Sequence, residues 1–570
     1  MPPTTVPRFP WLPVWLRHYQ RAWLSGDVSA GLIVAVLVIP QSLAYTLLAG
    51  LPPEMGLYAS ILPVVAYALV GSSMTLAVGP VAIAALMTAS ALQPLAIAGT
   101  TEYVQLAMHL ALISGAMFLA FGALRLGWLA YFLSHPVVSG FVSGSAVVIA
   151  LGQLKHILGV AAPSSSTWAT LQGLWRALPQ TNTTSLALGL GSMVFLLLSK
   201  RYLANSLRRL GVASQAADLL ARMAPIAAVA LSTSLVAWGG WDIARNVAVV
   251  GTVPAGLPAF AVTLPGLTEL GQLWLPALLI SLVGFVGSVS VAQSFAMQRQ
   301  QRITPDRELW GLGAANVAAA LSGAYPVHGG LSRSVINFAA GAQTPLASLI
   351  TAAFMAVIIY FFTGLFYYLP LAVLAASIMV AVASLVDVAT LKASWAYDRA
   401  DALSLLSTAV GVMVLGVETG IVLGVAMSLA ALVWRSSHPH MAVVGRVPGT
   451  EHFRNVERHA VQTVPGLLAL RVDESLFFAN ATALEERIEA LVQADASIRR
   501  LLLVCSAVNQ IDATALGMLT ALEQSLAERG IRLELAEVKG PVMDRLQVTA
   551  LGQRLHGRVF QSVHDAFVAG

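Results

Sequence analysis

The chain has 570 residues, of which 57% are hydrophobic and 10% are charged, and its mean hydropathy is +0.77. A soluble protein usually carries about 25% charged residues, so this composition excludes an ordinary soluble protein. The single cysteine, Cys505, excludes a disulfide framework and a cysteine-ligated metal cluster. The net charge of +5 requires no nucleic-acid partner, because positive flanks of membrane spans account for it.

The first segment, residues 1–26, lacks an apolar core, so no cleavable signal is expected in it. From residue 27 to residue 437, apolar runs such as 28–53 and 408–434 are long enough to span a bilayer. About fourteen such segments can be counted, some of them short. The sequence therefore predicts a polytopic α-helical membrane domain over 27–437 and a cytoplasmic segment over 1–26.

Lysine and arginine residues give the orientation of the membrane domain. If the N-terminus is inside, fifteen basic residues near span ends fall on the cytoplasmic side and three, Lys155, Arg176 and Arg245, fall outside. This bias predicts a multi-pass protein of the inner (cytoplasmic) membrane with its C-terminal region in the cytoplasm. The cluster Lys200, Arg201, Arg208 and Arg209 fits a cytoplasmic loop that obeys the same rule.

Two apolar segments are interrupted where helix should continue. Gly79–Pro80 breaks the segment 71–87, and Gly329–Gly330 breaks the segment 327–341 in the second half of the chain. Backbone that leaves the helix within a membrane must be buried in protein or line a cavity. Paired breaks in two halves indicate a transporter site built from inverted repeats. The polar residue Gln41 precedes Gly79 by 38 positions (79 − 41), and Gly287 precedes Gly330 by 43 (330 − 287).

The residues at these breaks favour an anion. Each half-helix that begins at a break presents free amides and about half a positive charge at its N-terminus. Arg333 adds a further charge, and Ser332 and Ser334 are expected to donate hydrogen bonds without adding negative charge. No acidic residue is near either break in the sequence. The pattern predicts a pocket for a small anion.

The motifs resemble those of a known family. The stretch "IPQSLAYTLLAGLPPEMGLYASILPVVAYALVGSSMTLAVGPVAIAALM" (39–87) closely resembles the signature of the SulP sulfate permeases, solute carrier family 26, and "GGLSRSVINFAAGAQTPLA" (329–347) resembles their second signature. The tail resembles the STAS domain of these transporters. The resemblance implies fourteen helices in a seven-plus-seven inverted repeat, like uracil and anion-exchanger transporters. It also implies a homodimer and elevator-like movement of a core against a gate.

The resemblance also implies which residues form the site. The third and tenth helices begin at the two breaks and hold the anion, and the first helix completes the pocket. The substrate-binding residues expected from the family pattern are Gln41, Tyr45, Gly79, Val81, Ala82, Gly330, Leu331, Ser332 and Arg333.

Two departures from the family concern coupling to a cation. Many members carry an acidic residue in a "GFVES"-like stretch of the eighth helix, where this chain has Gly287 in "GFVGS". The absence of this acidic residue argues against coupling to a cation at that position and favours exchange or facilitated passage of the anion. His328 replaces a small residue of the relatives, and because histidine titrates near neutrality it could link transport to protons.

Structural alternatives remain open for the same residues. Arg333 could hydrogen-bond backbone carbonyls at the break, and Gln41 could only tie two helices together. Tyr45 could belong to the core, Gly79–Pro80 could be an ordinary kink, and His328 could be a hydrogen-bonded structural residue.

The region 438–570 reads as a soluble α/β domain, with the STAS domain beginning near residue 463. Residues 466–472 and 499–507 are predicted strands, and 484–493 and 515–529 are predicted helices with 3.6-residue periodicity. In related anti-sigma-factor antagonists a serine is phosphorylated at the position of Thr514, which is therefore a regulatory candidate. A role in folding, trafficking or dimer contact is the alternative.

Together these features predict a secondary transporter of a small inorganic or carboxylate anion, with sulfate as the default of the family. The alternatives are a channel-like or anion-gated membrane protein, a sensor that feeds the STAS domain, and an exchanger of bicarbonate, chloride or dicarboxylate. No residues support an enzyme, and no cofactor or metal is expected. The expected partners are the anion, the lipid bilayer and a second copy of the chain.

Overall fold

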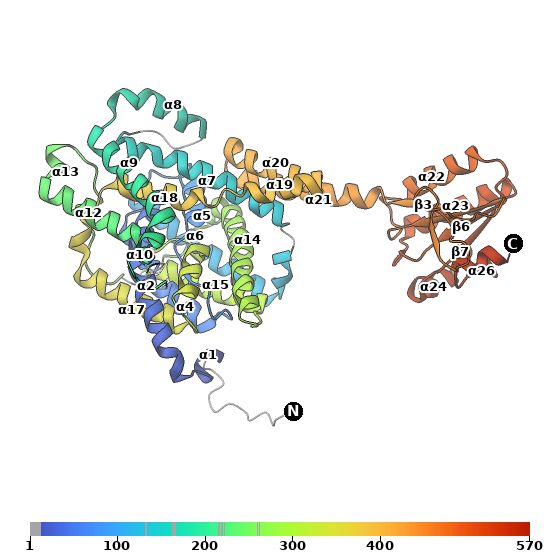
Figure 1. The fold of residues 1–570 in the computed structure, drawn as a ribbon, viewed down its shortest axis with the longest axis horizontal. Helices are drawn as coiled ribbons and strands as arrows, with labels where there is room; N and C mark the ends of the chain where they lie inside the picture. Colours follow the sequence, from blue (N-terminus) through green and yellow to red (C-terminus); the bar gives the residue numbers. More distant parts are fainter. Residues whose placement is uncertain are drawn as a thin grey trace. The chain divides into compact units, whose positions relative to one another are not determined.

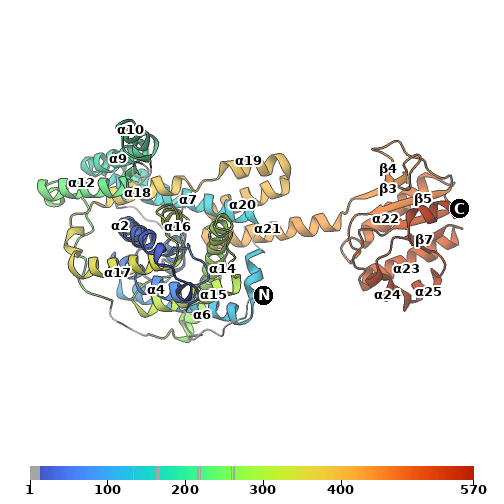
Figure 2. The same ribbon diagram turned by 60° about the horizontal axis from the view of Figure 1, so that its bottom comes forward.

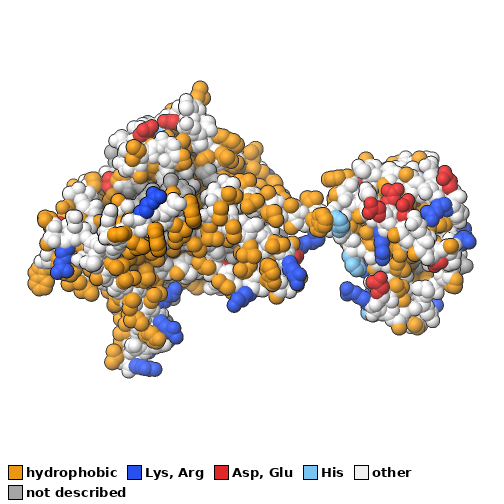
Figure 3. Space-filling view, turned by 90° about the horizontal axis from the view of Figure 1, so that it is seen from above, with side chains coloured by type: hydrophobic (Ala, Val, Ile, Leu, Met, Phe, Trp, Pro, Cys, Tyr) orange, Lys and Arg blue, Asp and Glu red, His pale blue; other side chains and the backbone are white. Residues whose placement is uncertain are grey.

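The computed structural model describes residues 13–569 except 132–133, 162–166, 215–216, 218–219, 222, 259 and 261–262. Residues 1–12 of the predicted N-terminal segment 1–26 therefore lie outside the described residues. The chain forms two compact units, Met1–Ser428 and Leu429–Gly570 (Figure 1). Apolar side chains cover much of the visible face of the first unit, whereas the second shows a mixed polar and charged surface (Figure 3).

The region before the C-terminal sheet is almost entirely helical. Among the described residues, seven helical segments are long and apolar enough to cross a membrane, and four shorter apolar helices accompany them. The elements are α1 (Val14–Arg17), η1 (Arg21–Trp23), α2 (Leu24–Leu48), α3 (Glu54–Tyr58), α4 (Leu62–Val70), α5 (Ala82–Leu92), α6 (Thr101–Ala123), η2 (Leu126–Tyr131), α7 (His135–Leu158), α8 (Thr167–Ala177), η3 (Leu178–Gln180), α9 (Thr183–Leu198), the π-helical segment η4 (Ser199–Leu203), α10 (Ala204–Arg209), α12 (Ala224–Gly239), α13 (Trp241–Ala244), α14 (Leu267–Gln298), α15 (Pro305–Leu321), α16 (Leu331–Ala339), α17 (Leu346–Phe361), η5 (Thr363–Phe366), α18 (Leu371–Ala383), α19 (Val388–Tyr397), α20 (Arg399–Leu415) and α21 (Val417–Ser437).

The membrane helices pack as two groups. In the first, which we call the core bundle, α6 packs on α14 and α15, α4 packs on α15 and α17, and α2 packs on α16 and α17. In the second, the gate bundle, α7 packs on α9, α18 and α20, and α18 packs on α9 and α12. The bundles meet where α2 contacts α12 and α18 and where α5 contacts α7. Figure 2 shows α2 and α16 inside this arrangement, with α14, α17 and α18 around them.

The two predicted breaks meet each other at the centre of the core bundle. Strand β1 (Val78–Gly79) pairs antiparallel with β2 (His328–Gly329), with Val78 opposite Gly329 and Gly79 opposite His328. The Gly330 amide donates to the Ala77 carbonyl at 3.0 Å, which extends the pairing. Backbone that leaves the helix within a membrane must find such partners, since lipid offers none. We call this pairing the crossing.

Two buried carboxylates fix the chain around the crossing. Glu308 of α15 accepts from the Tyr67 hydroxyl at 2.7 Å and from the amides of Ser72 and Ser73 at 2.9 and 3.0 Å. Asp27 of α2 accepts from the backbone amides of residues 343 and 344, in the loop between α16 and α17. A buried carboxylate is stabilised only when donors surround it, as they do here. Both acidic residues are therefore structural.

The C-terminal unit is a six-stranded sheet with the strand order β4-β3-β5-β6-β7-β8. Strands β5 to β8 are parallel, and β3 is antiparallel to both of its neighbours. Its strands are β3 (Met441–Arg446), β4 (Phe453–Asn455), β5 (Leu467–Val472), β6 (Arg500–Val504), β7 (Arg532–Ala536) and β8 (Val559–Phe560), and its helices are α22 (Ala481–Ala494), α23 (Ala513–Glu528), α24 (Gly540–Gln547), α25 (Ala550–Arg554) and α26 (Val563–Val568).

The side chains of the central strands point alternately to the two faces of this sheet, and those on both faces are apolar, so helices cover both faces. Leu501 and Leu503 of β6 pack in one apolar cluster with residues of α22 and α23, whereas Leu502 and Val504 pack in another with residues of α26. Successive side chains of a strand point to opposite faces, so a continuous apolar run predicts a strand buried on both sides. The predicted strands 466–472 and 499–507 and the two predicted helices are confirmed, although β6 ends at Val504.

Cys505 follows β6 directly and provides a test of this packing. Its side chain is 2% exposed, and burial raises the pKa of its thiol to about 12. At pH 8 only about one thiol in ten thousand would be ionised, and the thiolate is the reactive form. We expect iodoacetamide to leave the native protein unlabelled at pH 8 and to label it stoichiometrically in denaturant, as measured by mass spectrometry. Rapid labelling of the folded protein would contradict this packing.

Candidate functional site

A cavity of about 740 Å³ lies between the core bundle and the gate bundle. Five of the sequence-predicted site residues line it: Gln41, Tyr45, Ala82, Leu331 and Ser332. The remaining lining residues are Leu37, Pro40, Ala44, Leu196, Lys200, Ala204, Ala221, Ala224, Pro225, Val335, Ile336, Ser377, Ile378, Val380, Ala381, Val382, Ser384 and Leu385. Helices α2, α5 and α16 supply one wall, and α9, η4, α10, α12 and α18 supply the other.

Two half-helices begin at this cavity. Helix α5 starts after Val81 and α16 starts after Gly330, and neither N-terminus has a side-chain cap. The first residues, Ala82 of α5 and Leu331 of α16, line the cavity. The first amides of a helix have no intrahelical partner, and together they carry about half a positive charge. The two ends therefore contribute about one positive charge next to the cavity.

Three polar side chains of the core bundle face the same space. Gln41 and Tyr45 are one turn apart on α2, so both lie on one face of that helix. Gln41 is half-buried and Tyr45 is 8% exposed, and both line the cavity. Ser332, in the first turn of α16, is exposed to it. An amide and two hydroxyls can donate hydrogen bonds to an anion without bringing negative charge.

The gate bundle adds a cation that sequence reasoning missed. Lys200 lines the cavity from η4, a π-helical turn after α9, whereas the sequence suggested only a loop outside the membrane. Ser377 of α18 also lines it, and its buried hydroxyl oxygen has no hydrogen-bond partner among the described residues. In the sequence, Lys200 looks like any basic residue at the end of a span. No aspartate or glutamate is among the described residues that line the cavity.

Arg333 does not line the cavity. It is 5% exposed, and its Nη1 and Nη2 atoms donate to the carbonyls of Val78 at 3.2 Å and Pro80 at 2.7 Å. This is the geometry of the structural alternative given above, in which the guanidinium binds backbone at the break. Arg333 therefore holds the crossing together, and its charge acts on the cavity only through space.

The remaining residues of the two breaks build the crossing. Gly79, Val81 and Gly330 are not among the lining residues of the cavity. The expectation that Ser334 donates to the anion is wrong, because it is fully buried and its hydroxyl oxygen accepts from the Ala77 amide at 3.0 Å. Asn337 donates to the Thr75 carbonyl at 3.1 Å in the same way. One face of α16 is thus bonded to the segment before α5.

The two residues considered for coupling also lie outside the cavity lining. His328 is 3% exposed, packs against Gly284 of α14 and meets the Phe118 ring edge-on with the centroids 6.2 Å apart. Its Nε2 atom has no hydrogen-bond partner among the described residues. Gly287, also on α14, is half-buried, and a Cβ added there would meet nothing within 4 Å.

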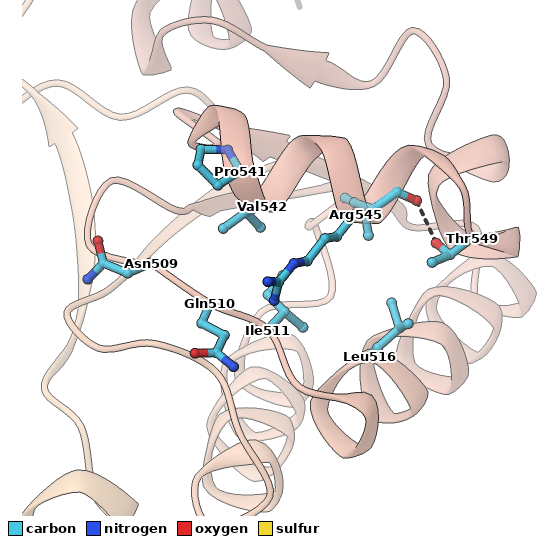
Figure 4. Close-up of a pocket in the computed structure, with 9 residues that line it drawn as sticks. Asn509, Gln510, Ile511, Leu516, Pro541, Val542, Arg545 and Thr549 are labelled. Carbon is cyan, nitrogen blue, oxygen red and sulfur yellow. Dashed lines mark hydrogen bonds between the residues drawn. The ribbon is translucent and has the colours of Figure 1, made fainter. Parts of the chain in front are cut away.

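The C-terminal unit has a small hollow of about 150 Å³ between α23 and α24. Figure 4 shows Arg545 extending from α24 across this hollow toward Gln510 and Ile511. The other described lining residues are neutral, and no group of three or more His, Cys, Asp or Glu side chains that could hold a metal occurs among the described residues. Thr514 is exposed on the first turn of α23 and does not line the hollow.

Comparisons with known proteins agree with this arrangement. Residues 24–408 match the model of the "Sulfate permease family", and residues 458–566 match that of the "STAS domain". A protein of Mycobacterium tuberculosis named "Probable sulfate transporter" is 34% identical over 98% of both chains, and "Sulfate transporter 4.1, chloroplastic" of Arabidopsis thaliana is 33% identical over 97% of this chain and 81% of its own.

Two solved structures share the fold. The structure of SLC26A9 matches with a TM-score of 0.88 over 98% of this chain and 92% of its own, at 21% identity. The transmembrane domain of the cyanobacterial bicarbonate transporter BicA matches with a TM-score of 0.61 over 71% of this chain and 98% of its own, at 24% identity. The predicted fold class, a membrane transporter domain followed by a STAS domain, is confirmed.

Proposed function

We propose that this chain, which belongs to the sulfate permease family of membrane anion transporters, carries sulfate-like anions through the cavity between its two bundles. The observation that carries the proposal is the crossing, since it aligns two uncapped half-helix N-termini on one cavity wall. Lys200 on the opposite wall adds a positive charge, and the lining residues that the structure describes include no carboxylate. An anion placed there would be stabilised from both sides.

The proposed anion site comprises the first amides of α5 and α16 with Gln41, Tyr45 and Ser332 from the core bundle and Lys200 from the gate bundle. Arg333, Gly79, Val81 and Gly330 act indirectly, because they set the positions of the two half-helices. His328 and Gly287 lie outside the cavity lining, which argues against a direct role of either in binding the anion.

The core bundle forms one wall of the cavity and the gate bundle forms the other, and this division suits an elevator-type movement. The crossing, Glu308 and Asp27 join distant parts of the core bundle, and its helices pack on one another, so they would move as one body. The gate bundle contributes Lys200 and Ser377 but none of the half-helix amides. We therefore propose that the core bundle carries the anion past the gate bundle, as a rigid body that exposes its site alternately to each side.

The membrane orientation and assembly belong to the same proposal. The positive-inside bias favours a cytoplasmic N-terminus and a cytoplasmic STAS domain in the inner membrane. The domain limits that we propose are 1–26, 27–437 and 438–570. A homodimer is proposed by analogy with the family, and light scattering in detergent would test it.

Labelled sulfate uptake into liposomes that contain the purified chain tests this function. We expect saturable uptake that competes with unlabelled sulfate and is absent from protein-free liposomes. Uptake that requires an anion on the far side would indicate exchange, and acceleration by a proton gradient would indicate proton coupling. A bulk anion current that never saturates would contradict a carrier and support the channel-like alternative. If bicarbonate, chloride or a dicarboxylate outcompetes sulfate, the substrate assignment changes while the site remains.

A further inference from the structure

A second, smaller cavity of about 180 Å³ lies at the other end of α5. Ala82, at the start of this helix, lines the large cavity, whereas Leu86, Ala89 and Ser90, toward its end, line the small one. Ser90 is eight positions after Ala82 (90 − 82) on α5, which corresponds to about 12 Å along the helix. The proposed site therefore faces the large cavity, and the small cavity lies further along the same helix. We call the large one the inner cavity and the small one the outer chamber.

The outer chamber is also shared by the two bundles. Its core-bundle wall is formed by the ends of α2 and α5, and its opposite wall by α7, α8 and the junction of α20 and α21. The carrier proposed above needs a compartment of this kind, because the core bundle must deliver its anion to the far side of the gate bundle. About 180 Å³ holds several waters, each with a share of about 30 Å³, or a small oxyanion with fewer waters.

The polar side chains of the outer chamber suit an anion. Lys155 supplies a positive charge, and Gln153, Gln93 and Ser90 supply amide and hydroxyl donors. Gln153 is 4% exposed although it is polar. Among the lining residues that the structure describes, His156 is the other titratable group, and none is an aspartate or glutamate. No salt bridge among the described residues joins Lys155 to a carboxylate. A cation within a membrane span usually serves a function and has a partner.

Lys155 and Lys200 stand at opposite ends of the gate bundle. The end of α7 adjoins the start of α9, because the Asn182 amide donates to the Leu158 carbonyl at 2.9 Å. Lys155 is in the last turn of α7, and Lys200 follows the end of α9. The 16 residues of α9 span about 24 Å. The gate bundle thus carries one ammonium group at each cavity.

We infer that Lys155, with Gln153 and Gln93, forms an outer capture site for the anion, as Lys200 does at the inner cavity. This inference rests on the proposed function and on the proposed membrane orientation. A charge at the mouth of a site raises the rate at which an oppositely charged ligand associates and makes that rate depend on salt. Lys155 is therefore a positioning residue that affects binding from one side of the membrane only.

Sided transport kinetics test this inference. Labelled sulfate uptake is measured in right-side-out and inside-out membrane vesicles from cells that express the full chain. For Lys155→Gln we expect the KM at the outer face to rise about fivefold, the effect of one charge at about 4 Å in water-like surroundings, while the KM at the inner face stays unchanged. Lys155→Arg keeps the charge and should keep the outer KM. Lys200→Gln, which alters the proposed anion site itself, should raise the KM measured at the inner face.

A thiol variant gives an independent measurement. The only natural cysteine, Cys505, is buried, so the thiol of Lys155→Cys is the reactive one. A membrane-impermeant reagent that attaches an ethylammonium group from outside should restore the low outer KM, whereas the matching sulfonate reagent should not. An outer KM of Lys155→Gln equal to that of the wild type, or an equal rise at both faces, would overturn the inference and indicate only a stabilising role at the end of α7. Absence of sulfate flux in wild-type vesicles would instead overturn the proposed function.

Discussion

Replacing Gly79 by alanine is expected to reduce anion transport to less than about a tenth of the wild-type rate. Gly79 has a φ of +152°, which L side chains rarely adopt, and an added Cβ would overlap Nη1 of Arg333. Strained backbone costs about 1–3 kcal/mol, and the guanidinium would have to leave the carbonyl groups that it binds. The crossing would open, and the N-termini of α5 and α16 would lose their alignment.

The measurement is labelled sulfate uptake in liposomes at matched protein content. Gly191→Ala is the matched control, because Gly191 is a helical glycine of α9 whose added Cβ would meet nothing within 4 Å. We expect the control to transport like the wild type. A Gly79→Ala protein with near-normal uptake would show that transport does not depend on the crossing.

Replacing Arg333 by alanine is expected to weaken sulfate binding at least tenfold and to lower the Tm. The substitution leaves the carbonyls of Val78 and Pro80 without donors, at about 1–3 kcal/mol for each buried group. It also removes a positive charge next to the cavity. A unit charge about 10 Å from a monovalent anion contributes about 1.7 kcal/mol at an effective dielectric constant of about 20, which exceeds a tenfold change in Kd.

Arg333→Lys separates the two effects. A lysine keeps the charge but lacks the planar guanidinium whose two nitrogens reach two carbonyls, so the Tm should fall while most of the affinity remains. Calorimetric titration of the purified proteins with sulfate gives the Kd, and thermal unfolding gives the Tm. An Arg333→Ala protein that binds sulfate with the wild-type Kd would contradict any role of this charge in binding.

The local sequence was sufficient to predict the membrane domain, the two helix breaks and the main strands of the C-terminal unit. Long apolar runs can be stable only in lipid, so the membrane domain follows from composition. Gly79–Pro80 and Gly329–Gly330 interrupt helices because of their own backbone properties, and the two half-helices α5 and α16 begin directly after them. Strands β5 and β6 were predictable from their short apolar runs.

The tertiary structure alone decided which side chains face the cavity. Val78 and Gly329 are 251 positions apart (329 − 78), and only their pairing determines that Arg333 binds backbone and that Ser334 accepts a hydrogen bond. The rotation of η4 brings Lys200 to the cavity, and the approach of α14 buries His328. Composition and periodicity determine whether a segment lies in lipid or in water and which secondary structure it forms, because both are local properties of the sequence. The partner of a buried polar group depends on how distant helices pack, and no local pattern encodes that.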